Sequence, residues 1–138
     1  MASNPALLFS TCIAVRWGDM DSYGHVNNSV YLRYLEEVRL QWFKLVGVQI
    51  GPNVPSPVVL QIQHTYLKPV IHPATVRLEL IHADAGRTSL TLHHRLFIEG
   101  DVQACGEGYC KLVWLDPTTG RSSPLPECLR ALARSPQS

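Results

Sequence analysis

The stretch Asn27–Gly47, NNSVYLRYLEEVRLQWFKLVG, decides the fold of this 138-residue chain. Its apolar residues recur at steps of three and four, which predicts a helix of about five turns with one broad apolar stripe. Any of the polar residues 27–29 can cap the start of this helix, and Gly47 can supply a left-handed exit. The stripe consists of Tyr31, Tyr34, Leu35, Val38, Trp42, Leu45 and Val46.

On both sides of this helix the spacing of apolar residues changes to two, which is typical of strands. Alternation predicts one strand before the helix, at 9–15, and four after it, at 60–66, 76–83, 90–98 and 102–115. Gly106 and Gly108 in the last strand indicate a bulge or a close approach of the backbone. A short closing helix is expected at 126–134.

One helix cannot cover both faces of a five-stranded sheet. The pattern therefore predicts an α+β architecture, with a curved five-stranded antiparallel sheet wrapped around one long central helix. Edge strands and the outer face of such a sheet invite further pairing, so we expect at least a dimer. The length fits a single domain over residues 1–138.

Composition narrows the function classes. Hydrophobic residues make up 46% and charged residues 17%, which predicts a packed core rather than a disordered chain. The 12 basic and 11 acidic residues nearly balance, which argues against a nucleic-acid partner. No apolar run approaches the ~20 residues that span a bilayer, and the N-terminus lacks the pattern of a signal peptide. We therefore expect a cytoplasmic protein with no membrane partner.

The most unusual chemistry lies directly before the helix, in residues 16–28, RWGDMDSYGHVNN. Two carboxylates, an imidazole and two amides share a loop that ends where a helix presents unpaired N–H groups and a partial positive charge. An oxygen that becomes anionic during acyl transfer would be stabilised there, typically by ~3–4 kcal/mol for one donor. A nearby carboxylate can attack an acyl carbon or deprotonate water. The same residues can instead form Asx turns and helix caps, and spacing alone leaves both readings open.

A family resemblance favours the catalytic reading. The stretch Asp21–Tyr31, DSYGHVNNSVY, followed by Tyr34-Leu35-Glu36 and Arg39, resembles the signature of the hotdog-fold acyl-CoA thioesterases, in the 4-hydroxybenzoyl-CoA thioesterase-like family. The resemblance runs from about residue 9 to residue 132. It implies the hotdog fold and hydrolysis of a fatty-acyl or aryl thioester to the carboxylate and free CoA. It also implies an active site between protomers of a homodimer or homotetramer.

The resemblance also implies roles for single residues. The family's catalytic aspartate falls on Asp21 rather than Asp19, as nucleophile or general base. The backbone N–H that polarises the thioester carbonyl falls on Asn28. A similarity to plant acyl-carrier-protein thioesterases adds His25. The further residues expected to bind the substrate are Tyr31, Lys68, Arg87, Thr88 and Ser89, with the cations suited to the phosphates of CoA.

Two other functions remain open at this point. A hotdog-fold hydratase or dehydratase acting on enoyl thioesters would pair Asp21 with His25 as base and acid. A non-catalytic module would bind acyl-CoA without turnover. The substrate handle is CoA or an acyl-carrier protein. We expect no cofactor, and the histidines and cysteines lack metal-ligand spacing.

Overall fold

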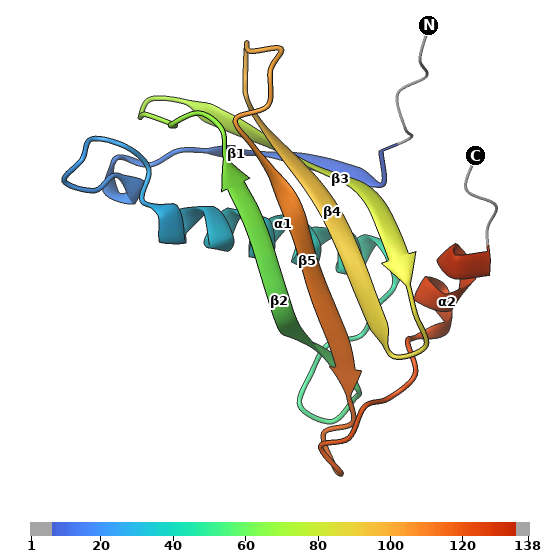
Figure 1. Ribbon diagram of the computed structural model, residues 1–138. Helices are drawn as coiled ribbons and strands as arrows, with labels where there is room; N and C mark the ends of the chain where they lie inside the picture. Colours follow the sequence, from blue (N-terminus) through green and yellow to red (C-terminus); the bar gives the residue numbers. More distant parts are fainter. Residues whose placement is uncertain (1–6, 135–138) are drawn as a thin grey trace, which may run out of the picture.

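The computed structural model describes residues 7–134. The elements follow the predicted order: β1 (Phe9–Ala14), the short 3-10 helix η1 (Trp17–Asp19), α1 (Asn28–Val46), β2 (Ser56–Tyr66), β3 (Thr75–Ala85), β4 (Ser89–Ile98), β5 (Gly106–Leu115) and α2 (Glu127–Arg134). The strands form one antiparallel sheet in the order β1-β3-β4-β5-β2. This sheet curves around α1, which confirms the predicted α+β architecture (Figure 1).

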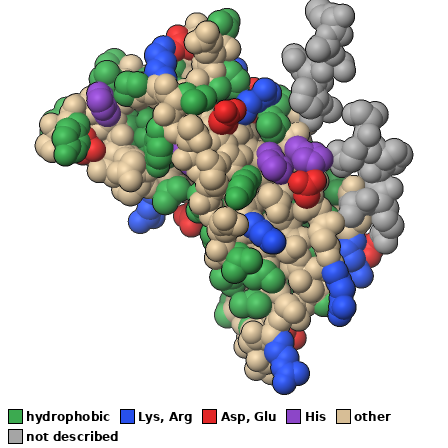
Figure 2. All heavy atoms as spheres, in the orientation of Figure 1, with side chains coloured by type: hydrophobic (Ala, Val, Ile, Leu, Met, Phe, Trp, Pro, Cys, Tyr) green, Lys and Arg blue, Asp and Glu red, His purple; other side chains and the backbone are tan. Residues whose placement is uncertain are grey.

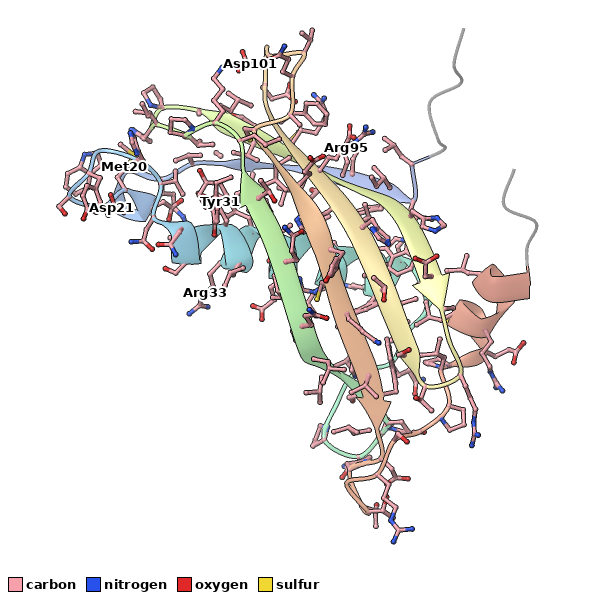
Figure 3. The ribbon with its side chains drawn as sticks, viewed as in Figure 1. Met20, Asp21, Tyr31, Arg33, Arg95 and Asp101 are labelled. Carbon is pink, nitrogen blue, oxygen red and sulfur yellow. The ribbon has the colours of Figure 1, made fainter. Side chains whose placement is uncertain are left out.

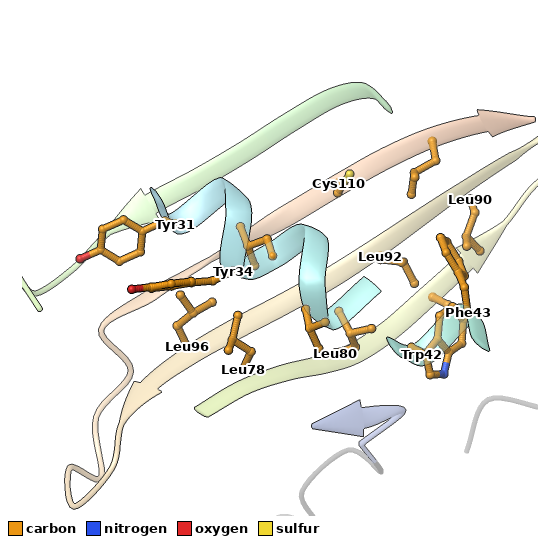
Figure 4. Packing of buried hydrophobic residues seen from close by; sticks show 14 of the residues in the cluster. Tyr31, Tyr34, Trp42, Phe43, Leu78, Leu80, Leu90, Leu92, Leu96 and Cys110 are labelled. Carbon is orange, nitrogen blue, oxygen red and sulfur yellow. The ribbon is translucent and has the colours of Figure 1, made fainter. Parts of the chain in front are cut away.

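The helix α1 begins and ends as its sequence predicts. Asn27 caps the start, because its side-chain oxygen accepts a hydrogen bond from the Ser29 amide at 2.9 Å. Gly47 ends the helix in the left-handed conformation, with φ of 93°. Between them the helix packs its buried stripe against the inward rows of the sheet, as Figure 4 shows for Tyr31, Tyr34, Leu78, Leu80, Leu92 and Leu96.

Three details of the sequence prediction are wrong. The strand expected at 60–66 already begins at Ser56, which pairs with Leu115 of β5. Leu45 was expected in the buried stripe but is 68% exposed. Phe43 is buried in its place. The centroid of its ring lies 5.6 Å from that of Trp42 in the same helix and 5.8 Å from that of Trp114 in β5. The last strand begins at Gly106 rather than at Val102, which is 93% exposed. Its neighbours offer no partner there, since the ladders of β5 with β2 and with β4 both end at Gly106.

The two faces and the edge of the sheet differ in character. The outer face carries a mixture of polar and charged side chains (Figure 2). Within residues 7–134, β2 is hydrogen bonded to β5 on one side only. This edge exposes three consecutive apolar residues, Val58, Val59 and Leu60. No helix among the described residues is long and apolar enough to cross a membrane.

Candidate functional site

Asp19 ties the loop between β1 and α1 to the helix. Its Oδ2 accepts hydrogen bonds from the Tyr34 hydroxyl at 2.6 Å and from the Arg16 backbone N–H at 2.9 Å. Partial burial opposes ionisation, but these two hydrogen bonds outweigh it and lower the pKa of Asp19. Asp19 thus holds the loop against the first turns of α1.

Asp21 lies at the tip of the same loop, next to Met20 (Figure 3). Its Oδ1 accepts a hydrogen bond from the Tyr23 amide at 2.9 Å, and its Oδ2 accepts one from Asn27 Nδ2 at 3.1 Å. Gly24 closes the turn with a φ of 82°. Because Asn27 also caps α1, one side chain joins the Asp21 carboxylate to the start of the helix.

The start of α1 offers one unused backbone donor. The Asn27 N–H donates to the Asp19 carbonyl at 3.0 Å, and the Val30 N–H donates to the Asn27 carbonyl at 2.9 Å. The Ser29 N–H donates to the Asn27 side chain. The Asn28 N–H makes no hydrogen bond within the described part of the chain. A free N–H at a helix start, with the positive end of the helix dipole behind it, can hold an oxygen that becomes anionic.

A hollow of about 220 Å³ opens beside this donor. It contains four of the residues predicted for the site, His25, Asn28, Tyr31 and Lys68, and is completed by Val26, Tyr66, Leu67 and Pro69. Asp21 lies outside the residues that line this hollow and is connected to it through Asn27. A second hollow, of about 570 Å³, is lined by Asp19 and Tyr34 among others and does not include Asn28. The smaller hollow is therefore the better candidate for an acyl site.

The predicted residues in the hollow differ in what they can do. His25 is exposed, and its backbone carbonyl, not its imidazole, accepts a hydrogen bond from the Asp21 amide at 2.9 Å. Tyr31 lies between α1 and β2, where burial raises the pKa of its hydroxyl to about 12 (Figure 3). Lys68 forms an exposed ion pair with Asp101 at 2.6 Å, which offsets its charge.

The chain does not bring Arg87, Thr88 and Ser89 to the loop that carries Asp21. The loop follows Ala14, which pairs with Thr75 at the start of β3. The hairpin with these three residues follows the other end of β3 and leads into β4. Within one chain they lie at the opposite end of the sheet from Asp21, so their contact with substrate stays a prediction that requires a second protomer.

Sequence reasoning missed two polar contacts beneath the hollow. The Tyr66 hydroxyl donates to the Asn28 carbonyl at 2.9 Å. Behind it, His64 Nδ1 and His94 Nε2 lie 2.9 Å apart. The signal was present, because both histidines occupy inward positions of strands whose other inward residues are mainly apolar. A polar residue on such a row is a buried polar group that needs a partner.

Comparisons with known proteins agree with this fold. The model of the thioesterase-like superfamily matches residues 15–132. The PA2801 protein of Pseudomonas aeruginosa, a candidate thioesterase, is 53% identical, with 91% of this chain and 98% of that chain covered and a TM-score of 0.86. A candidate acyl-CoA thioesterase from Xanthomonas campestris is 36% identical, with 86% and 100% covered and a TM-score of 0.73. A thioesterase from Thermus thermophilus, complexed with coenzyme A and Zn, is 30% identical, with 94% and 100% covered and a TM-score of 0.76. The chain therefore belongs to the thioesterase-like superfamily, with the hotdog fold.

Proposed function

We propose that this protein is an acyl-CoA thioesterase that hydrolyses a fatty-acyl or aryl thioester to the carboxylate and free CoA. The observation that carries the proposal is the unbonded Asn28 N–H at a hollow, one residue from the Asn27 side chain that holds the Asp21 carboxylate. The relatives from Xanthomonas campestris and Thermus thermophilus support CoA as the substrate handle.

In this proposal the thioester carbonyl oxygen accepts a hydrogen bond from the Asn28 amide. Asp21 then either attacks the carbonyl carbon itself or removes a proton from an attacking water. Negative charge that develops on the oxygen is stabilised by the amide and by the start of the helix. Breaking of the carbon–sulfur bond releases the CoA thiolate, which is a good leaving group, so neither a metal nor another cofactor is required. Where Asp21 is the nucleophile, this step leaves a mixed anhydride between the acyl group and Asp21, which a water molecule then hydrolyses to the carboxylate and the free Asp21 side chain.

We further propose that the site is completed between two protomers. The edge strand β2 is long and exposes three apolar residues, and an unpaired strand of this kind tends to associate with another chain. Leu32 and Leu40 of α1 are also exposed. If two β2 strands pair antiparallel, the two sheets run in opposite directions. The partner's Arg87 then lies at the same end of the dimer as Asp21, where it can approach the phosphates of a bound CoA.

The test is release of free thiol from acyl-CoAs of graded chain length and from aromatic members. Asp21→Ala should lose at least about a hundredfold in activity, with an unchanged circular dichroism spectrum. The matched control is Asp84→Ala, which removes an exposed carboxylate from the outer face of the sheet. This control should keep the wild-type rate. No thiol release from any of these substrates would contradict the proposed activity, and near-full activity of Asp21→Ala would remove Asp21 from the mechanism.

The same assay separates the other two functions. Loss of enoyl-thioester absorbance without thiol release would identify a hydratase. Thermal stabilisation by acyl-CoA without any turnover would identify a binding module. The structure gives the hydratase little support, because no hydrogen bond joins the Asp21 carboxylate to the His25 imidazole in residues 7–134.

A further inference from the structure

Two histidines face each other in the core, beneath the hollow. His64 Nδ1 and His94 Nε2 lie 2.9 Å apart, and the two rings are stacked with their centroids 5.1 Å apart. Gly108 of β5 pairs with both histidines, and a Cβ there would collide with the backbone of Gln63 in β2. A Cβ at Gly106 would be 2.5 Å from His64 Nε2. Gly108 thus allows the close approach of β2 and β5, and Gly106 leaves room for the His64 imidazole.

Burying this pair of imidazoles in the core lowers the stability of the folded protein. His94 is 3% exposed, and His64 Nε2 is buried with no hydrogen-bond partner among the described residues. A buried polar atom without a partner costs stability. Apolar side chains would fill the same space at lower cost. The pair therefore points to a role other than stability.

The histidine pair is connected to the start of α1 through the Tyr66 side chain. The His64 ring packs against Tyr66 at a centroid distance of 4.6 Å and an angle of 81°. Tyr31 packs against Tyr66 from α1, at 4.9 Å and 85°. The Tyr66 ring is thus held by both, while its hydroxyl donates to the Asn28 carbonyl at 2.9 Å. A tyrosine hydroxyl is protonated at neutral pH and can donate, and partial burial raises the pKa of Tyr66 further.

We propose that Tyr66 is a positioning residue of the acyl site and that the His64–His94 pair holds its ring in place. Fixing the carbonyl of Asn28 fixes the first turn of α1, and with it the direction of the free N–H of the same residue. Oxyanion stabilisation depends on that direction, because the donor must meet the oxygen at about 2.7–3.1 Å. The effect on turnover rests on the proposed thioesterase function, whereas the effect on the Asn28 amide does not.

The first experiment removes only the hydroxyl. Tyr66→Phe should lower kcat about tenfold and leave KM within about twofold. The matched control is Tyr109→Phe, on the outer face of β5, which should change neither constant. A rise in KM without a fall in kcat would show that Tyr66 binds substrate rather than positions the donor, and would overturn the proposal.

The second experiment tests whether His64 acts through Tyr66. His64→Leu should lower kcat in the wild-type background but add less than about twofold in the Tyr66→Phe background. His64→Asn, which keeps a polar group, replaces it if His64→Leu does not fold. Effects that multiply in full would show that His64 acts by another route, and would overturn the supporting role of the pair.

The third experiment needs no turnover. The amide resonance of Asn28 should shift, and its hydrogen exchange should accelerate, in Tyr66→Phe but not in Tyr109→Phe. An unchanged Asn28 amide would overturn the positioning role at any level of activity. If the wild-type protein hydrolysed no acyl-CoA, the proposed function would fall, while the Asn28 resonance would still decide what Tyr66 does.

Discussion

Acidification should destabilise this protein mainly through the most deeply buried imidazole, that of His94. Its side chain is almost completely buried, and the groups that act on it are His64 of β2, Arg39 of α1 and its neighbour His93, with no carboxylate among them. Burial, together with these three groups, lowers the pKa of His94 from its ordinary 6.5 to about 3. Between about pH 6.5 and pH 3, His94 is therefore neutral in the folded protein and protonated in the unfolded chain.

The sign and size follow from proton uptake by the two states. Above about pH 6.5 the imidazole is neutral in both states and contributes nothing to the pH dependence. As the pH falls from there toward 3, only the unfolded chain gains the proton, so the free energy of unfolding decreases. At pH 5 the loss is about 2 kcal/mol, since one pH unit corresponds to about 1.4 kcal/mol. For 138 residues this lowers Tm by about 7 °C.

Thermal unfolding near pH 7.5 and near pH 5, at one protein concentration, measures this loss. The double variant His64→Leu/His94→Leu removes both imidazoles together, so that neither is left facing an apolar side chain. Its Tm should fall between the two pH values by at least about 7 °C less than that of the wild type, because it also removes His64, whose pKa burial lowers as well. The control His25→Gln removes an exposed histidine and should behave as the wild type. Equal falls in the wild type and in the double variant would refute the argument that His94 is kept neutral.

Two further predictions concern the loop and the sheet edge. Tyr34→Phe removes the hydroxyl that donates to Asp19 at 2.6 Å. It should lower the free energy of unfolding measured in urea by about 2 kcal/mol and also lower the activity. Unchanged stability would show that the loop is held by other contacts. Leu60→Lys places a charge on the exposed edge of β2 and should lower the oligomeric state measured by light scattering. Val102→Lys, a control at an exposed position in the loop after β4, should not, and a Leu60→Lys protein that kept its oligomeric state would place the interface elsewhere.

The sequence predicts the framework well because the framework depends on periodicity. The helix from Asn28 to Val46 and the alternating strands follow from apolar spacing, and the cap at Asn27 follows from its amide. The errors lie where tertiary contacts decide. Phe43 rather than Leu45 is buried because a tryptophan of β5 lies beside it, and no local pattern records that neighbour.

The candidate site is predictable only in part, for the same reason. Its location before the helix follows from the composition of the loop. The hydrogen bond that joins Asp19 to the helix depends on Tyr34, fifteen residues later in the chain. The meeting of His64 and His94 depends on the order of the strands and on a glycine in the strand between them. Alternation within each strand places both on inward rows but does not show that the rows are neighbours.

The contact of His64 with Gly106 affects the order in which these two residues can be substituted during evolution. An alanine at position 106 would bring its Cβ to 2.5 Å from an imidazole that neighbouring rings keep from swinging aside. We therefore expect an alanine at position 106 to be tolerated best when a smaller residue stands at position 64. In a lineage or a mutant library, a substitution of His64 should therefore precede a substitution of Gly106.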